Sequence, residues 1–403
     1  MSGDFISVAT LGGSSRGYLA LPEAGSGPGL ALFCDVSEGE GVLRELGDLY
    51  AAEGYVVLCR EPFAVANGVA DITATVVALR GRRECTGKVG ALGFGLGGKL
   101  ACLAAAEAGI DCAVSYYGFG IDFGLNLLSR TGCPMVMHFA EKDPAIRPEA
   151  VARIKQASSE RPNIAIYVYP GVAPGFGHKD RPNYDRSAAG LAHSRSIALL
   201  RQVMGPRYDL EALWERHTRY EFETRDVAAT MQTMVAEPYV NHVPVMTGGV
   251  GHRDLARFYA HHFIPKCPAD IRLVPVSRTI GPDRLVDEMV LSFTHDVEID
   301  WMLPGVPPTG RRVEVPLVAI VNFRGDKLYH EHIYWDQASV LVQIGLLDPE
   351  GLPVAGVETA AKLLDIRRPS NSLMARCAAA PTLTLPACGG GNGRGSGHLE
   401  FGY

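Results

Sequence analysis

Residues 93–98, GFGLGG, stand between an apolar run and a helix-like segment. Their spacing fits G-x-G-x-x-G, which binds a pyrophosphate at a helix N-terminus, and also G-x-nucleophile-x-G, the strand–turn–helix elbow of α/β-hydrolases. The second interpretation is favoured, because the turn follows the third predicted strand and Asp111 precedes the next strand instead of ending it. Asp143 and His178 follow in the nucleophile–Asp–His order of those hydrolases. The elbow centre, however, is Gly95, which has no side chain to form a covalent intermediate.

Without a nucleophile, Asp143 and His178 have two interpretations. They form a dyad that activates water directly, or they are a retained scaffold in which the aspartate orients the histidine and nothing reacts. Cys102 does not replace the nucleophile, because it lies two helical turns further on. The amide of Leu96 at the start of the helix would still bind an anion, so the site would hold a carboxylate without cleaving it.

A second group of polar residues falls on the predicted strand 327–336. Side chains alternate between the faces of a strand, so His330, His332, Tyr334 and Asp336 share one face. Such a face is either exposed to solvent or lines a cavity. In a cavity, Asp336 would act as general base on a proton flanked by carbonyl groups, and one of the other three would stabilise the enolate oxygen. Asp336 also directly precedes a helix-like run, where aspartate is favoured as an N-cap.

Large apolar residues accompany these polar groups. Asp287 and Phe293 share a face of an earlier strand, and mixed polar and apolar side chains suit a small-molecule pocket. Desolvation near Trp301 would raise the pKa of Asp336 toward neutrality. His242 lies on a predicted loop beside a glycine-rich turn, where it would rim the same cavity. The substrate-contacting residues predicted in this half are Asp287, Phe293, Trp301 and Trp335.

Composition narrows the class of partner. The 403 residues include 38 basic and 44 acidic residues, a net charge of −6, which argues against binding nucleic acid or an anionic membrane through bulk charge. The nine cysteines include no C-x-x-C pair, and the first residues show no signal-peptide pattern, so we expect a cytoplasmic protein. His330, His332 and Asp336 have acceptable spacing for a metal, but each histidine would need an outer hydrogen-bond partner, so we expect no metal and no organic cofactor.

The predicted elements divide the chain into two domains and a tail. In residues 1–205 apolar runs alternate with helix-like segments, which predicts a doubly wound α/β sheet. Residues 206–370 begin with helices and continue with strands, which predicts an α+β domain with a curved antiparallel sheet on helices. Residues 371–403 are rich in alanine, proline and glycine, which predicts a flexible tail. The predicted strands are 29–36, 55–61, 88–93, 112–117, 134–139, 164–169, 271–278, 284–294, 312–323 and 327–336, and the predicted helices are 42–52, 72–79, 96–108, 148–158, 187–204, 210–225, 227–236, 252–263 and 337–344.

Residues 15–205 resemble the dienelactone hydrolase family. The resemblance rests on Lys88–Leu100 (KVGALGFGLGGKL), Met137–Asp143 (MHFAEKD) and Gly175–Arg186 (GFGHKDRPNYDR). It implies an α/β-hydrolase fold in which the family's nucleophilic cysteine would occupy the position of Gly95. Asp35 falls where the family usually carries glutamate, which implies a substrate contact. The implied triad is therefore degenerate.

Residues 208–347 resemble the nuclear transport factor 2-like superfamily, in particular the SnoaL-like polyketide cyclases. The matching stretches are 241–244 (NHVP), 251–263 (GHRDLARFYAHHF), 287–295 (DEMVLSFTH), 309–320 (TGRRVEVPLVAI) and 334–343 (YWDQASVLVQ). In those cyclases an acidic residue near the end of the last strand acts as general base, and Asp336 matches that position. Curved sheets of this type often pair, so the resemblance also implies a homodimer.

Three functional hypotheses follow. The first is a cyclase, lyase or isomerase that needs no cofactor and acts on a polyketide-like small molecule in the second domain. The second is a hydrolase, either of an ester or lactone through water activated by His178 and Asp143, or of an epoxide at Asp336. The third is a binding or assembly protein with two inactive sites.

Overall fold

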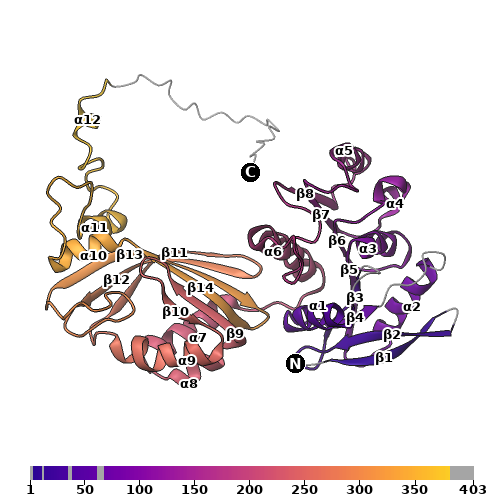
Figure 1. Cartoon of the computed structure of the whole chain (residues 1–403), viewed down its shortest axis with the longest axis horizontal. Coiled ribbons are helices and arrows are strands. Elements are labelled where there is room, and N and C mark those ends of the chain that lie inside the picture. Colours follow the sequence, from indigo (N-terminus) through magenta and orange to yellow (C-terminus); the bar gives the residue numbers. More distant parts are fainter. Residues whose placement is uncertain (1–2, 11–12, 35–38, 61–67, 382–403) are drawn as a thin grey trace. The chain divides into compact units, whose positions relative to one another are not determined.

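The computed structural model describes residues 3–10, 13–34, 39–60 and 68–381, and these form two compact units. Unit 1 comprises Met1–Trp214 with the short segments Ile280–Arg284 and Asn322–Leu328. Unit 2 comprises Glu215–Thr279, Leu285–Val321 and Tyr329–Tyr403. Each unit has its own sheet (Figure 1). In the predicted tail, residues 375–378 form the short helix α12 (Ala375–Ala378), and residues 382–403 lie outside the described part.

Unit 1 contains an eight-stranded sheet in the order β1-β2-β4-β3-β5-β6-β7-β8. The hairpin β1–β2 pairs antiparallel with β4, and the strands from β4 to β8 are parallel to one another. Every residue of β3, β4, β6 and β7 is buried, as expected for parallel strands covered on both faces. The predicted doubly wound sheet is therefore confirmed. The strands are β1 (Asp4–Thr10), β2 (Gly13–Ala20), β3 (Gly27–Phe33), β4 (Val56–Arg60), β5 (Cys85–Phe94), β6 (Ala113–Tyr116), β7 (Met135–Ala140) and β8 (Ile164–Tyr169).

Helices cover both faces of this sheet. One core cluster contains side chains of α1 and α6, and the other contains side chains of α2 to α5, which agrees with the two layers of helices in Figure 1. These clusters fix the carboxyl ends of the parallel strands, where the candidate hydrolase residues lie. The helices are α1 (Glu40–Ala52), α2 (Gly68–Arg80), α3 (Leu96–Glu107), α4 (Asn126–Arg130), α5 (Pro148–Ala157) and α6 (Arg186–Met204).

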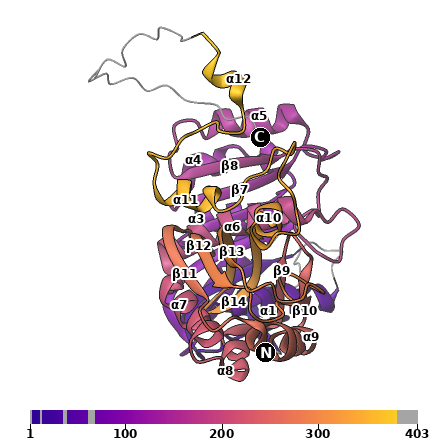
Figure 2. The same cartoon turned by 90° about the vertical axis from the view of Figure 1, so that its left-hand side faces the viewer.

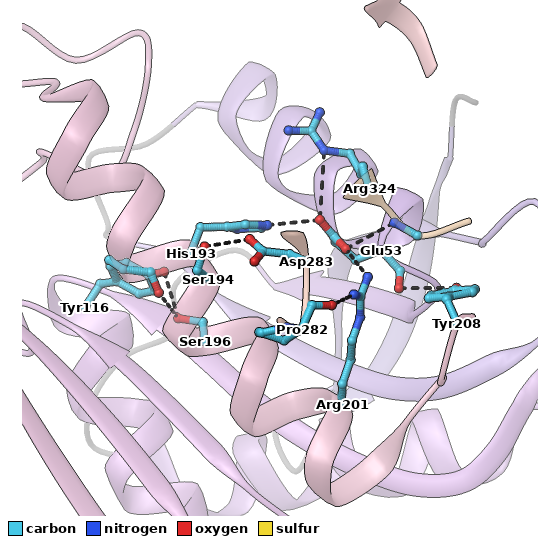
Figure 3. Close-up of polar contacts among 12 residues, drawn as sticks. Glu53, Tyr116, His193, Ser194, Ser196, Arg201, Tyr208, Pro282, Asp283 and Arg324 are labelled. Atoms are coloured by element: carbon cyan, nitrogen blue, oxygen red, sulfur yellow. Dashed lines mark hydrogen bonds and ion pairs between the residues drawn. The ribbon is translucent and has the colours of Figure 1, made fainter. Parts of the chain in front are cut away.

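A buried carboxylate, Glu53, gathers three basic side chains at the end of α1 (Figure 3). Its oxygens accept hydrogen bonds from His193 Nε2 at 3.0 Å, Arg201 Nη2 at 2.7 Å and the Gly325 amide at 3.2 Å, and Arg324 Nε lies 3.9 Å away. Burial alone would raise the pKa of Glu53, but these cationic partners outweigh burial and lower it. Glu53 therefore remains ionised inside unit 1.

Unit 2 is built around a six-stranded sheet in the order β10-β9-β14-β13-β12-β11. Helices α7, α8 and α9 gather along one side of this sheet (Figures 1 and 2). The expected α+β arrangement of a curved sheet with helices is confirmed. The strands are β9 (Met234–His242), β10 (Thr247–Val250), β11 (Arg272–Ile280), β12 (Arg284–Thr294), β13 (Arg312–Arg324) and β14 (Lys327–Trp335). The helices are α7 (Leu210–Phe222), α8 (Val227–Gln232), α9 (His252–Phe258), α10 (Gln337–Ile344) and α11 (Glu358–Leu364).

Two parts of the predicted secondary structure were wrong. The helix predicted over 227–236 ends at Gln232, and β9 begins at Met234. The helix predicted over 252–263 keeps α-helical geometry only to Phe258 and continues as a π-helical turn over Tyr259–Phe263. Pro238 argues against a central strand, because proline cannot donate to the ladder, and this is why β9 was not predicted.

Candidate functional site

The predicted strand–turn–helix elbow is present in unit 1. β5 ends at Phe94 and α3 begins at Leu96, and Gly95 between them has φ 57° and ψ −122°. The flanking glycines permit very close backbone contacts. A Cβ on Gly97 would stand 2.0 Å from the Phe33 carbonyl oxygen, and one on Gly93 would stand 1.9 Å from the Gly97 carbonyl oxygen. These close approaches explain the glycine-rich sequence without a dinucleotide.

His178 lies in a buried loop, and its expected partner is not bonded to it. Only 3% of His178 is exposed, and neither ring nitrogen has a hydrogen-bond partner among the described residues. Asp143 Oδ1 instead accepts hydrogen bonds from the amides of Ala145 at 2.8 Å and Ile146 at 3.1 Å, which closes its own loop. The expected hydrogen bond between Asp143 and His178 is therefore wrong.

A different carboxylate approaches the histidine. Glu45 on α1 places Oε2 3.6 Å from His178 Nε2 and Oε1 3.3 Å from Lys179 Nζ. Cys102 inside α3 is fully buried, and burial raises the pKa of its thiol to about 12, so this thiol does not replace the absent nucleophile. Asp35, predicted to contact substrate, lies outside the described residues.

The polar face of β14 lies toward solvent instead of toward the helices. The predicted alternation is confirmed, with His330 and His332 half-buried, Tyr334 40% exposed, and Asp336 exposed beyond the strand end. The two imidazoles lie 5.0 Å apart between centroids and contact the ring of Tyr239 on β9. The strand was therefore predicted correctly, but the polar residues on its solvent-facing side do not line a desolvated cavity.

Asp336 is a helix cap. Its Oδ1 accepts hydrogen bonds from the amides of Ala338 at 3.0 Å and Ser339 at 3.3 Å, at the start of α10. The expected desolvated environment of this carboxylate is wrong, because the carboxylate is exposed and bonds the first turn of α10. A catalytic role for Asp336 remains a prediction. The burial that would have raised the pKa of its carboxyl group is not present, since the residue is exposed.

Three of the predicted site residues do come together, around His242. This histidine ends β9 instead of lying on a loop, and it is 3% exposed. Its ring centroid lies 5.3 Å from that of Trp301 and 5.8 Å from that of Trp335. Phe258 and Phe263 complete an aromatic enclosure, at 5.7 Å and 5.5 Å. We call these four rings around His242 the aromatic box.

Hydrogen bonds fix the tautomer of His242. The Thr247 hydroxyl donates its proton to the Trp301 carbonyl oxygen at 2.6 Å, so the Thr247 Oγ1 atom accepts a hydrogen bond from His242 Nδ1 at 3.2 Å. Nε2 is then the acceptor nitrogen. Burial lowers the pKa of His242 to about 3, so the imidazole is neutral at pH 7.

The two remaining predicted contacts lie elsewhere on β12. Asp287 and Phe293 share the buried face, as the alternation predicted. Asp287, however, is paired with Arg278, whose Nη2 and Nε lie 2.9 Å and 3.2 Å from its oxygens.

A buried charged cluster was missed from the sequence. His217 and Glu221 on α7 meet Glu331 on the inner face of β14, and His217 Nε2 lies 3.1 Å from Glu221 Oε1 and 3.2 Å from Glu331 Oε1. Burial lowers the pKa of His217, but the two carboxylates outweigh burial and raise it to about 10. Burial also raises the pKa of Glu331, against the opposing effect of His217. The i,i+4 spacing on α7 and an inward-facing glutamate were the available signals.

No described helix is long and apolar enough to cross a lipid bilayer. This finding concerns only the described residues.

Comparisons with known proteins agree with this architecture. The sequence profile of the dienelactone hydrolase family matches residues 60–204, and that of the SnoaL-like domain matches residues 214–331. A protein of Azospirillum brasilense named "Putative carboxymethylenebutenolidase" is 31% identical over 222 residues, which covers 48% of this chain and 95% of that protein. A carboxymethylenebutenolidase of Pseudomonas putida is 30% identical over 140 residues, 35% of this chain and 59% of that protein.

A solved structure from Klebsiella pneumoniae described as "Putative Dienelactone Hydrolase" is 20% identical, with a TM-score of 0.45, and the match covers 50% of this chain and 98% of that one. The two families predicted from sequence motifs are thus confirmed. The chain belongs to the dienelactone hydrolase family through its first half, and a SnoaL-like domain follows in the second.

Proposed function

We propose that the protein is an enzyme that acts on a small carbonyl compound by general acid–base chemistry in its SnoaL-like domain, as a cyclase, lyase or isomerase. The group that moves the proton is the imidazole of His242. The observation that supports this most is the neutral, tautomer-fixed histidine inside the aromatic box. Asp336, the base expected from sequence, is exposed and caps a helix instead.

The chemistry follows from the state of the imidazole. A neutral Nε2 accepts a proton from the carbon next to a carbonyl group, and the electron pair of the broken C–H bond moves onto the carbonyl oxygen. The imidazolium formed is costly in an apolar surrounding, but the enolate formed beside it compensates its charge. Trp301 and Trp335 pack against His242 and make its surroundings apolar and aromatic, the kind of lining that suits a planar polyketide-like substrate.

Proton exchange at carbon tests this proposal without knowledge of the natural substrate. The probe is 1-tetralone in D₂O, and the readout is the loss of its α-proton signal in the ¹H NMR spectrum with the full-length protein. We expect His242→Gln to reduce the protein-dependent exchange by about 10²–10⁴-fold, the usual contribution of a positioned base. Because the imidazole is neutral above about pH 4, the exchange rate should be flat from pH 5 to 8.

Two controls make the test specific. Asp336→Asn and His178→Gln should exchange 1-tetralone as fast as the wild type, because neither residue belongs to the aromatic box. The proposal would be contradicted if proton exchange continued in His242→Gln but was lost in Asp336→Asn. The base would then be Asp336, on the solvent-facing side of β14.

A second candidate is hydrolysis in the α/β-hydrolase domain, and the position of His178 favours it. Neither ring nitrogen of this buried imidazole has a hydrogen bond to any residue that the structure describes, and Glu45 lies 3.6 Å away, so the imidazole is a candidate to activate a water molecule. Relatives named carboxymethylenebutenolidase belong to the same family. Hydrolysis of p-nitrophenyl acetate should then fall at least about 100-fold in His178→Gln and stay unchanged in His242→Gln. Equal activity of His178→Gln and the wild type would exclude this second function.

A further inference from the structure

The charged cluster of unit 2 gathers three metal-ligating side chains. His217 and Glu221 stand one turn apart on α7, and Glu331 comes from the inner face of β14. One ligand atom from each lies within 4.8 Å of the others, and the three residues are 0%, 3% and 3% exposed. The proposed acid–base chemistry at His242 does not use them.

Hydrogen bonds on the far side of His217 fix which nitrogen faces the carboxylates. The Thr233 hydroxyl donates to the Thr230 carbonyl oxygen at 2.6 Å, so it accepts from His217 Nδ1 at 2.6 Å. Nε2 therefore faces Glu221 and Glu331. An imidazole held by an outer hydrogen bond on one nitrogen, with carboxylates beside the other, is the usual arrangement of a metal-bound histidine.

The cluster brings two acids together on one imidazole nitrogen. Both carboxylates lie within 3.2 Å of His217 Nε2 in a buried site, so all three offer ligand atoms to the same point. A single N–H faces two acceptors: it bonds Glu221 Oε1, and within the described part of the chain the buried Glu331 Oε1 has only the 3.2 Å contact with the same nitrogen, outside ideal hydrogen-bond geometry. A divalent cation would compensate both carboxylates at once.

A buried hydroxyl stands next to the same site. Tyr259, 1% exposed, opens the π-helical turn and packs its ring edge-on against His217, with centroids 6.3 Å apart. Its hydroxyl lies beside Glu221, with a contact outside ideal hydrogen-bond geometry, so it adds a fourth polar group to the buried cluster. π-helical turns are frequent at functional sites.

We propose that His217, Glu221 and Glu331 bind one divalent transition-metal ion, such as Zn²⁺, through the imidazole Nε2 and one oxygen of each carboxylate. One nitrogen and two carboxylate oxygens match the ligands of zinc, whereas magnesium prefers oxygen ligands and retains water. The ligand atoms already lie within 4.8 Å of one another, so the three side chains need little rearrangement to hold one ion. This site departs from the sequence-based expectation of no metal.

Metal binding is measured directly on the full-length protein, without a histidine tag, after dialysis against EDTA and then metal-free buffer. Zn²⁺ is added with a chromophoric chelator as competitor, and bound zinc is counted by mass spectrometry after desalting. We expect about one zinc per chain. Glu331→Gln and His217→Gln should each lose at least 100-fold in affinity, since outer partners alone already contribute 10–100-fold.

Thr233 supplies a matched pair that leaves the three ligands intact. Thr233→Ser keeps the hydroxyl and should bind zinc as the wild type does, whereas Thr233→Val removes the partner of Nδ1 and should weaken binding by about 10–100-fold. Circular dichroism and thermal unfolding show whether each variant is folded. This readout does not involve activity, so its failure leaves the proposed function of His242 unaffected.

Two outcomes would overturn the proposal. One is no zinc bound more tightly than about 10 µM, which would leave protons as the occupants of the cluster. The other is a bound zinc that survives Glu331→Gln and His217→Gln but is lost in the double variant His330→Gln and His332→Gln, which would place the ion on the solvent-facing side of β14.

Discussion

At the scale of single residues, Gly95 forms the turn from β5 into α3. Its φ of 57° lies in the left-handed region that side-chain-bearing residues rarely adopt, and its ψ of −122° turns the chain sharply from β5 into α3. The sequence motif predicted this turn, because only glycine permits the close contacts at Gly93 and Gly97. The backbone therefore keeps the shape of a nucleophile elbow at a position without a nucleophile.

Gly95→Ala should destabilise unit 1 by about 1–3 kcal/mol, because it places a Cβ on a strained backbone conformation. The measurement is the urea midpoint of full-length protein followed by tryptophan fluorescence and circular dichroism. Gly190→Ala in α6 is the matched control, since a Cβ there has no neighbour within 4 Å, and it should be neutral or stabilising by up to about 1 kcal/mol. Equal stability of both variants would show that Gly95 is not strained.

At the scale of elements, alternation along β14 was predictable and its orientation was not. The sequence correctly separates His330, His332 and Tyr334 from Glu331 and Trp335, since neighbouring side chains point to opposite faces. Which face meets the helices depends on the partner strands. β9 pairs next to β14, and Pro238 concealed β9 in the sequence. The sequence therefore left open whether the polar face is exposed to solvent or lines a cavity, and the inward-facing Glu331 was missed.

The role of Asp336 as a cap gives an element-scale prediction. Asp336→Ala should destabilise the protein by about 0.5–2 kcal/mol, because two amides of the first turn of α10 lose their acceptor. Asp336→Ser supplies another capping oxygen and should recover most of this loss. Urea unfolding of the three proteins at pH 7 measures the difference. If serine restores no stability, the loss in Asp336→Ala has another cause than capping.

At the scale of the whole molecule, the composition and the family motifs predicted the architecture. They did not predict polar clusters between residues far apart in the sequence. The strand–helix alternation and the order Gly95, Asp143, His178 were sufficient for the α/β-hydrolase fold. The cluster around Glu53 joins residues more than 130 positions apart in sequence, so no local pattern predicts it. The homodimer inferred by analogy remains a prediction.

Glu53 should control the acid stability of unit 1. Glu53→Gln leaves buried cations without their carboxylate, and we expect it to cost about 3–5 kcal/mol at pH 7. Because the folded pKa of Glu53 is lowered, its contribution is complete above the unfolded value of about 4.3 and is lost as the pH falls toward the folded value. The difference in the free energy of unfolding between wild type and Glu53→Gln should therefore be constant from pH 6 to 7 and decrease below about pH 4.5.

Urea unfolding at several pH values measures this contribution. Glu40→Gln, on the same helix, is the control, because its ion pair with Arg16 is about half exposed and should contribute less than about 1 kcal/mol at any pH. A pH-independent gap between wild type and Glu53→Gln would contradict the assigned role.

The glycine elbow has a consequence for how this chain tolerates change. Catalytic sites commonly hold a reactive side chain in an unfavourable conformation, which lowers the free energy of unfolding. Further destabilising substitutions elsewhere are then tolerated less well. Glycine at position 95 avoids this cost, because it has no side chain to strain, and the strand and helix on either side of it are still formed. The elbow therefore adds no strained side chain to the α/β-hydrolase domain, whichever residue carries the chemistry there.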